Sequence, residues 1–187
     1  MKLTTDLSSY DNGWYKKEIG ASRIKQFCWY FVNVLFFINP LNPSTGLKRW
    51  LLKLFGAKLG KGIVIKPGVN IKYPWKLSVG DHSWIGEKVW IDNLAAIHIG
   101  ANACISQGAM LLTGNHDYSK SGFDLIVKPI TLEEGVWIGA QALVCPGVYC
   151  KSHAVLSAKS VATKDLEAFT IYQGNPAIAV RERMINS

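Results

Sequence analysis

The amino-acid sequence predicts an all-β fold, a solenoid of short parallel strands with a short helical appendage at its N-terminal end. Three observations predict it: large aliphatic residues recur every six positions, smaller residues recur four positions after them, and apolar residues at helical spacing occur before residue 62. A period of six matches neither the 3.6-residue turn of a helix nor the alternation of an ordinary strand. It indicates short strands joined by regular corners, with each coil stacked on the previous one.

The repeat covers most of the chain after residue 62. The large positions are Ile65, Ile71, Val79, Ile85, Ile91, Ile99, Ile105 and Leu111, then Leu132, Ile138, Val144, Cys150 and Leu156, with slips of two residues before Val79 and Ile99. The smaller partners are Val69, Ser83, Val89, Ala95, Ala103 and Ala109, then Val136, Ala142, Val148, Ala154 and Ser160. We expect both sets to stack as ladders inside the solenoid. Gly80, Gly86, Gly100 and Gly139 each follow a large position, where we expect a corner angle that favours glycine.

The length of 187 residues and the hydrophobic fraction of 49% suit one domain with a small appendage. We assign residues 1–61 to an N-terminal segment and residues 62–187 to the solenoid domain. This domain includes a loop at 112–130, where the ladder stops, and a C-terminal tail at 166–187. A long break inside a regular solenoid more often has a use than not, so the loop is where we expect the chemistry.

The N-terminal segment contains two apolar stretches. Phe27–Ile38 is apolar except at Asn33, and its twelve residues fall short of the ~20 that a membrane-spanning helix needs. It is either a helix packed on the solenoid or a neighbouring subunit, or an interfacial helix on a membrane. After a break at 39–43, Ser44 or Thr45 can cap a short basic amphipathic helix. Such an appendage suits an acceptor carried on an anionic or lipid-linked molecule, and it also suits a cap on the end of the solenoid.

The net charge and the cysteines indicate which binding partners and which cellular compartment to expect. The net charge of +8 suits phosphorylated ligands or anionic lipid. We expect no nucleic-acid partner, because no zinc-finger, helix-turn-helix or RNA-binding aromatic pattern accompanies the charge. Residues 1–20 lack the features of a signal peptide, which favours a cytoplasmic protein that can also sit at the inner face of the membrane. The four cysteines form no C-x-x-C pair, which favours buried free thiols.

Several motifs together carry a resemblance to a known family. They are the loop sequence G-N-H-D at 114–117, the run L-x-x-G-x-W-I-G-A-x-A-x-V-x-P-G-V from residue 132, T-K-D at 163–165 and G-N-P-A at 174–177. The chain resembles the hexapeptide-repeat acyltransferases over roughly residues 63 to 183, and especially the sugar O-acetyltransferases of the galactoside, maltose and colanic-acid type. The resemblance implies a left-handed parallel β-helix, a homotrimer with sites between subunits, acetyl-CoA as donor and a saccharide acceptor.

Acyl transfer to a hydroxyl group needs a base, and His116 in the loop is the candidate. Imidazole titrates near neutral pH, and His116 matches the loop histidine of the resembling enzymes. Asp117 either orients the ring or is a solvated loop aspartate. Asp92 and Asn93 lie near the position where the family has an Asn or Asp that contacts the acceptor, and we favour Asn93. The two-residue slip before Ile99 leaves the choice between them open.

The resemblance also implies a set of residues along the cofactor. The backbone N–H of Ala140 matches the donor to the oxyanion, and Ala158 matches a small residue beside the pantetheine arm. Thr163 and Lys164 match contacts near the nucleotide, and Arg181 matches a cation at a cofactor phosphate. A basic residue of several relatives is replaced here by Ile178, so that contact is either missing or moved to Arg183 or Lys159. Ordinary coil packing is the alternative for each small residue.

We predict an acetyl-CoA-dependent O-acetyltransferase for a saccharide of a surface or exported polysaccharide, with direct attack of the hydroxyl group on the thioester. Three alternatives remain. An amine acceptor, such as an amino sugar, would use the same base and groove, and a non-catalytic membrane scaffold would use the same solenoid. A zinc enzyme needs three protein ligands, and no second histidine stands near His116 in the sequence, so we expect no metal.

Overall fold

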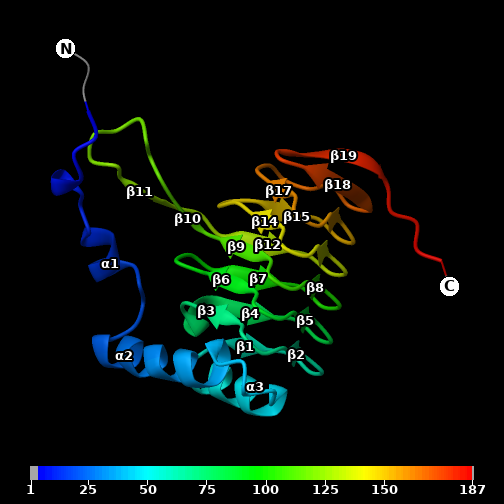
Figure 1. The fold of residues 1–187 in the computed structure, drawn as a ribbon, viewed down its shortest axis with the longest axis horizontal. Helices are drawn as coiled ribbons and strands as arrows, with labels where there is room; N and C mark the ends of the chain where they lie inside the picture. Colours follow the sequence, from blue (N-terminus) through cyan, green and yellow to red (C-terminus); the bar gives the residue numbers. More distant parts are fainter. Residues whose placement is uncertain (1–3, 187) are drawn as a thin grey trace.

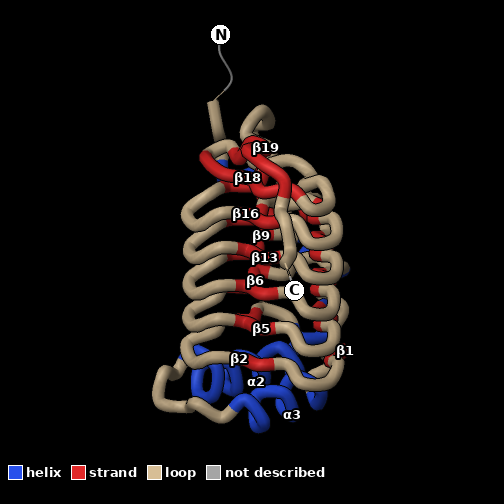
Figure 2. Tube along the Cα trace, turned by 90° about the vertical axis from the view of Figure 1, so that its right-hand side faces the viewer, coloured by secondary structure: helices blue, strands red, loops and turns tan. Residues whose placement is uncertain are grey.

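The computed structural model of the chain describes residues 4–186 and confirms the predicted parallel β-solenoid. The chain winds round a three-sided prism, and each turn adds one short strand to each of three sheets (Figure 1). Seen from the side, the strands of one sheet stack above one another, with helices across the N-terminal end (Figure 2). The interior between the three sheets holds the hydrophobic core.

The three sheets are named here A, B and C. Sheet A contains β1 (Lys58–Leu59), β4 (Leu77–Val79), β7 (Ile97–Ile99), β12 (Ile130–Leu132) and β15 (Tyr149–Cys150). Sheet B contains β2 (Val64–Ile65), β5 (Trp84–Ile85), β8 (Cys104–Ile105), β13 (Trp137–Ile138), β16 (Val155–Leu156), β18 (Thr170–Gly174) and β19 (Ala177–Glu182). Sheet C contains β3 (Asn70–Ile71), β6 (Trp90–Asp92), β9 (Met110–Leu112), β14 (Leu143–Val144) and β17 (Val161–Ala162). Strand pairs in the sheets are parallel except β18 with β19, which form an antiparallel ending to sheet B.

The predicted ladders fill the interior. Every predicted large position is at most 3% exposed, and the smaller partners are equally buried except Ala95. Ala95 is half-buried because it lies in a corner with extra residues and not on a flat face. The predicted start of the solenoid at residue 62 stays a prediction, and its first paired strand, β1, begins at Lys58.

The two-residue slips and the predicted loop all fall at one corner of the prism, between sheets C and A, which we call the C–A corner. Between β3 and β4 it contains the 3₁₀ helix η3 (Pro74–Lys76), and between β6 and β7 it contains residues 93–96. Between β9 and β12 it contains an antiparallel arm made of β10 (Gly114–His116) and β11 (Leu125–Val127). The A–B and B–C corners, in contrast, have four residues between strands in each of the five turns from β1 to β17.

The role predicted for the four glycines after ladder positions was wrong. Positive φ occurs two residues further along the corners, for example at Gly68, Lys88 and Gln141 of the B–C corner. The predicted glycines are needed for a different reason, because the next turn passes directly over them. A Cβ on Gly139 would lie 2.5 Å from the backbone N of Ala158, and one on Gly80 would lie 2.4 Å from that of Ala101.

The N-terminal segment caps the open end of the solenoid. It contains η1 (Leu7–Ser9), α1 (Gly13–Lys17), α2 (Arg23–Val32), the π-helix η2 (Asn33–Ile38) that continues α2, and α3 (Thr45–Leu54). As predicted, Ser44 caps α3, with its side chain accepting from the Leu47 N–H. In residues 4–186 no helix has the length and apolar character needed to cross a membrane.

The cap satisfies backbone groups of the first turn that have no further strand to pair with. Trp29 Nε1 donates to the Ile71 carbonyl (2.8 Å), and Thr45 Oγ1 donates to the Ile65 carbonyl (3.1 Å). The fully buried Lys48 ammonium donates to the carbonyls of Asn42 (2.8 Å) and Lys66 (3.2 Å), and burial lowers its pKa. A cap that buried these carbonyls without giving them donors would cost their desolvation, so one face of the helices is fixed by the solenoid.

Candidate active site

The arm that carries His116 is anchored at its base by a buried hydroxyl group. Thr113 Oγ1 donates to the Asp92 carbonyl (2.9 Å) and accepts from the Ala95 N–H (3.0 Å), so it ties the arm to the turn beneath it. The arm then leaves the solenoid as a two-stranded ribbon, with His116 paired opposite Leu125. In Figure 1 this ribbon extends from the C–A corner, on the side away from sheet B.

The loop fixes the protonation pattern of the His116 ring. His116 Nδ1 lies 2.8 Å from the Phe123 carbonyl oxygen, and a carbonyl oxygen can only accept. The proton of a neutral ring therefore stays on Nδ1, and Nε2 keeps its lone pair for a substrate proton. The Phe123 ring stacks on the imidazole, with centroids 4.4 Å apart and planes 9° apart. Phe123 has a φ of 53°, an unusual conformation for a bulky residue that suits a functional constraint.

The N-terminal segment reaches the same loop. The Asp6 N–H donates to the Ser121 carbonyl (2.9 Å), and the Tyr10 ring lies 5.7 Å from the His116 ring, tilted by 57°. Burial, together with Tyr15 and Asp11, raises the pKa of Tyr10. The imidazole thus lies between Phe123 and Tyr10, two neighbours that the sequence analysis did not identify. Nothing in the sequence alone linked Phe123 or Tyr10 to the ring of His116.

The three candidate acceptor residues occupy different surroundings. Asp117 accepts from the Ser119 N–H (3.0 Å) and Oγ (2.5 Å), which lowers its pKa and points its carboxylate along its own loop. The Asn93 amide is fully buried and bridges the N–H and carbonyl of Tyr73 (2.9 and 2.6 Å). Asp92 is 8% exposed and forms an ion pair with Lys72 through Oδ1 (2.8 Å), although that contact lacks hydrogen-bond geometry.

Asp92 also lines a cavity of about 390 Å³ between α2–η2 and the outer face of sheet C. Aromatic and charged side chains meet there, since Tyr30, Tyr73, Trp90 and Lys72 line the same space. Asn93 is absent from that lining and its amide is committed to the backbone. The structure therefore makes Asp92 the better placed of the two candidates for contact with a ligand.

Three of the predicted cofactor residues line one cavity. It has a volume of about 400 Å³ on the outer side of sheet B, and its lining includes Ala140, Ala158 and Arg181 together with Trp137. The small alanines leave the space open, and Arg181 supplies a cation at one edge. In the part of the chain that the structure describes, no acceptor receives a hydrogen bond from the Ala140 N–H. These features fit a long, partly apolar ligand with an anionic end.

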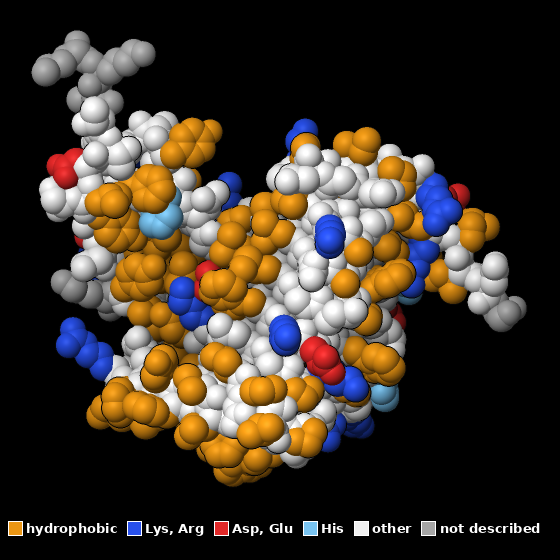
Figure 3. Space-filling view, in the orientation of Figure 1, with side chains coloured by type: hydrophobic (Ala, Val, Ile, Leu, Met, Phe, Trp, Pro, Cys, Tyr) orange, Lys and Arg blue, Asp and Glu red, His pale blue; other side chains and the backbone are white. Residues whose placement is uncertain are grey.

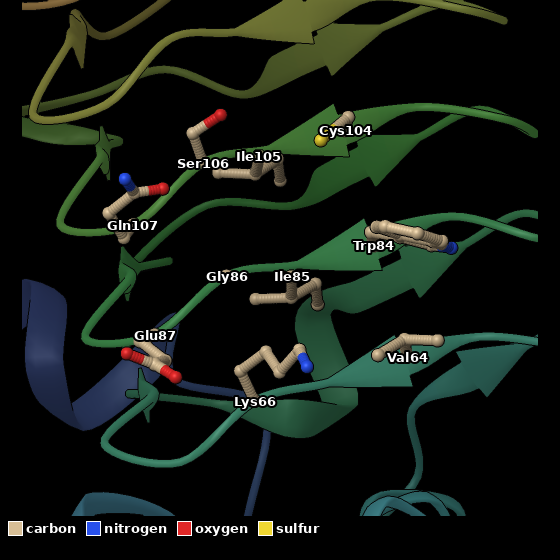
Figure 4. A pocket seen from close by; sticks show the side chains of 10 residues that line it. All are labelled: Val64, Lys66, Trp84, Ile85, Gly86, Glu87, Cys104, Ile105, Ser106 and Gln107. Atoms are coloured by element: carbon tan, nitrogen blue, oxygen red, sulfur yellow. The ribbon is translucent and has the colours of Figure 1, made fainter.

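A second cavity of about 330 Å³ continues along the same face. Figure 4 shows that its side chains come from β2, β5, β8 and the corners that follow them, with Val64 and Lys66 nearest the N-terminal end of the solenoid. Ser106 and Gln107 line both cavities, so the two form one groove along sheet B. The groove lies beside the B–C corner, whereas His116 lies on the arm of the C–A corner. Within one chain the arm of β10 and β11 and the strands β2, β5 and β8 lie on different sides of the prism (Figure 1).

The remaining predicted cofactor residues lie outside this cavity lining. Thr163 and Lys164 are exposed at the C–A corner after β17. Arg183 donates through Nη1 to the Gly135 and His153 carbonyls (2.8 and 3.0 Å), so it pins the C-terminal tail to the A–B corner. Ile178 is 66% exposed. The exposed Lys159, which follows Ala158, is therefore the better placed of the two replacement cations.

The thiol of Cys104 lines the groove along sheet B. Among residues 4–186, no three or more His, Cys, Asp or Glu side chains are grouped so that they could hold a metal ion. The four cysteines are free, and burial raises the pKa of Cys150 to about 12. The expectation that all four are buried was wrong. Cys104 and Cys145 are half-buried, and Cys28 is exposed on α2, because only the helix face towards the solenoid is covered.

Comparison with known proteins gives the family. No family model matches the chain. A protein of Escherichia coli K12 with the assigned name colanic acid biosynthesis acetyltransferase WcaF is 41% identical over 168 residues, which cover 88% of this chain and 91% of that protein. Galactoside O-acetyltransferase of the same organism is 29% identical over 154 residues, which cover 80% and 75% of the two chains.

A solved structure agrees with these relatives. A hexapeptide-repeat acetyltransferase of Vibrio cholerae, complexed with acetyl coenzyme A, superposes with a TM-score of 0.78 at 25% identity and covers 89% of this chain and 92% of its own. The chain belongs to the family of hexapeptide-repeat acetyltransferases, and it is an enzyme that transfers acetyl groups. The resemblance predicted from the sequence motifs is thereby confirmed.

Proposed function

We propose that the protein acetylates a hydroxyl group of a saccharide, using acetyl-CoA and His116 as general base, in the biosynthesis of an exported polysaccharide in the cytoplasm. The observation that carries the proposal is the hydrogen bond from His116 Nδ1 to the Phe123 carbonyl, which leaves Nε2 free to accept a proton. The names of the relatives, which refer to colanic acid and galactoside, support a saccharide acceptor.

The proposed reaction uses His116 of the arm and the Ala140 N–H of the groove together. His116 Nε2 takes the proton of the acceptor hydroxyl as its oxygen attacks the thioester carbonyl. The Ala140 N–H donates to the oxyanion that develops there, and the side chain at 140 adds no contact of its own. When the carbon–sulfur bond breaks, the imidazolium returns the proton to the leaving thiolate, so His116 ends the cycle neutral.

A homotrimer would unite the arm and the groove. Rotation about a threefold axis parallel to the solenoid axis keeps each residue at its own height, so an arm meets its neighbour at the level of the turn from which it leaves. The arm leaves after β9, in the same turn that carries Ser106 and Gln107, where the two cavities join. We therefore infer that His116 of one subunit serves the groove of the next, with Arg181, Lys159, Thr163 and Lys164 towards the nucleotide end.

For the acceptor we infer a seat near the C–A corner, with Asp92 as the preferred contact over Asn93 and Asp117. Trp90 and Tyr73 offer aromatic faces beside the Asp92 carboxylate in the same cavity. Pairing of an aromatic face with a carboxylate suits a sugar, which has an apolar ring face and a polar edge of hydroxyl groups. This assignment separates residues that hold the chain together, such as Asn93, from those that remain free to bind.

The test is release of CoA from acetyl-CoA in the presence of a panel of nucleotide sugars and polysaccharide repeat units. We expect acceptor-dependent release with at least one glycan, and loss of that release in His116→Ala. An amine acceptor would be revealed by an alkali-stable product, because an amide resists the mild base that removes an O-acetyl ester. Absence of transfer to every hydroxyl acceptor, with transfer to an amino sugar, would overturn the proposal.

A further inference from the structure

The positive charge of the chain is concentrated at one end of the molecule. Between Glu18 and Asp81 the sequence contains no Asp or Glu and ten basic residues: Arg23, Lys25, Lys48, Arg49, Lys53, Lys58, Lys61, Lys66, Lys72 and Lys76. The other eleven basic and thirteen acidic residues leave the remainder with a net charge of −2. The net charge of +8 therefore belongs to the N-terminal helices and the first turn of the solenoid with its following corner.

The same end exposes a large apolar surface. The outer stripe of α2 and η2 consists of Ile24 (77% exposed), Phe27 (65%), Phe31 (47%) and Leu35 (55%), which recur at helical spacing. The opposite stripe, with Trp29, Asn33 and Phe37, is buried on the solenoid. Capping of the solenoid therefore accounts for one face of the helix only, and within residues 4–186 the other face has no partner.

The connection to α3 and α3 itself extend this apolar surface. Leu41 is 85% exposed in the connection, and Trp50 and Leu54 of α3 are 60% and 63% exposed. Figure 1 shows α2 and α3 side by side across the end of the solenoid, and Figure 3 shows hydrophobic side chains gathered along that lower edge. A monomeric protein rarely exposes so many large apolar side chains together without a use for them.

We propose that this surface, formed by α2, η2, residues 39–43 and α3 and called here the basal face, docks on an anionic lipid membrane. Its aromatic and aliphatic side chains would enter the boundary between headgroups and acyl chains, and Arg23 and Lys53 would meet lipid phosphates. Helices that lie in a membrane interface combine an apolar face with Lys or Arg and aromatic residues in this way.

The charge distribution selects this occupant over a second copy of the chain. Two basal faces brought together would each carry the cations of residues 23–54, a stretch that contains five basic residues and no carboxylate side chain. An anionic membrane complements both the positive charge and the exposed apolar side chains of the basal face. It offers negative charge at its surface and an apolar layer just below it.

Docking would also bring a membrane-carried acceptor to the site, a consequence that rests on the proposed function. Tyr30, Val34 and Ile38 of the same helix line the cavity that Asp92 also lines. A saccharide linked to a lipid in the membrane would thus enter along the helix that contacts the membrane. The acceptor class that this geometry favours is a lipid-linked saccharide.

The test is co-sedimentation of the full chain with vesicles of phosphatidylcholine alone and with phosphatidylglycerol added. We expect the wild type to bind the anionic vesicles about tenfold more tightly, with binding that weakens as salt is raised. Phe27→Ser with Phe31→Ser removes two exposed side chains of the basal face and should reduce binding about tenfold. Arg23→Gln with Lys53→Gln should weaken binding and reduce its salt dependence.

The matched control removes two exposed apolar side chains from the C-terminal end, by Met184→Ser with Ile185→Ser (75% and 57% exposed), and should bind as the wild type does. All variants should keep wild-type circular dichroism and thermal stability. Equal sedimentation of wild type and Phe27→Ser/Phe31→Ser, or stable pairing of the basal face with another protein in place of vesicles, would overturn the proposal. The vesicle assay needs no turnover, so its outcome is independent of whether a glycan is acetylated.

Discussion

The B–C corner and the C–A corner of the prism differ in regularity, and this difference separates the surface beside the groove from the arm that carries His116. The B–C corner has the same four-residue length in each of the five turns from β1 to β17, and at two of its glycines, Gly86 and Gly139, a Cβ would lie 2.7 and 2.5 Å from the backbone of the next turn. The C–A corner contains every length change of that part of the chain, and one of its insertions carries the base. Regular repetition therefore builds a groove of constant depth, and a break in the repetition places a reactive group.

The largest loss of activity should come from a substitution in the arm of the C–A corner. His116→Ala removes the lone pair that accepts the hydroxyl proton, and we expect kcat to fall by ~10²–10⁴. The matched control is His98→Ala, because His98 is exposed on sheet A and its ring forms a hydrogen bond with the Ser78 hydroxyl group (2.7 Å). Steady-state kinetics should separate the two variants, and an equal loss in both would remove His116 from the mechanism. Thermal melting should stay near the wild-type value in each.

A stability comparison tests the regular corner against the irregular one. A Cβ at Gly139 would lie 2.5 Å from the Ala158 backbone, which cannot move without disturbing the whole turn. A Cβ at Gly114 would lie 2.6 Å from Leu94 Cδ1, the end of a side chain that can rotate away. We expect Gly139→Ala to cost about 3 kcal/mol, or about 5–10 °C in Tm, and Gly114→Ala much less. Similar melting temperatures, measured by calorimetry, would contradict the assignment of rigidity to the B–C corner.

A smaller effect, on KM for acetyl-CoA, is expected from a substitution of Arg181 in the groove. Arg181→Ala removes one cation from the cavity lined by Ala140 and Ala158, and we expect KM for acetyl-CoA to rise about tenfold with kcat little changed. Arg183→Ala is the control, because its guanidinium is bonded to the Gly135 and His153 carbonyls. It should lower the melting temperature and leave KM near the wild-type value. A reversed pattern would move the phosphate contact to Arg183.

These comparisons also explain which features the sequence could predict. The ladders were predictable because a six-residue period acts on every turn, and the buried Ile and Leu positions follow from it without further information. The backbone angles at the corners were not predictable, because glycine is favoured both where the next turn passes closely and where φ is positive. Only the structure shows that the first reason applies to Gly139 and the second to Gly68. His116 stood out as a histidine in an interrupted repeat. Tyr10 did not, because its contact joins two segments more than a hundred residues apart.

The choice between Asp92 and Asn93 stayed open at the sequence level for a related reason. Both side chains are short and polar, and the two-residue slip hides which of them faces inward. The structure assigns the Asn93 amide to Tyr73 and leaves one Asp92 oxygen with an ion pair alone. Which of the two side chains faces inward depends on how the corner packs. No period in the sequence describes that corner.

The smallest effect should come from Asp117, the neighbour of the base. Its carboxylate accepts from the Ser119 N–H and hydroxyl, which lowers its pKa, and it makes no hydrogen bond to the His116 ring. A lowered carboxyl pKa keeps Asp117 charged above its ordinary value of 3.8 and allows protonation only at more acidic pH, so it should add no step to a pH–rate profile between pH 5 and 8. Asp117→Asn should therefore change kcat by about threefold at most and leave the profile in place. A loss as large as that of His116→Ala would mean that the carboxylate turns to hold the imidazole during turnover, and the Phe123 carbonyl would no longer be sufficient to orient the base.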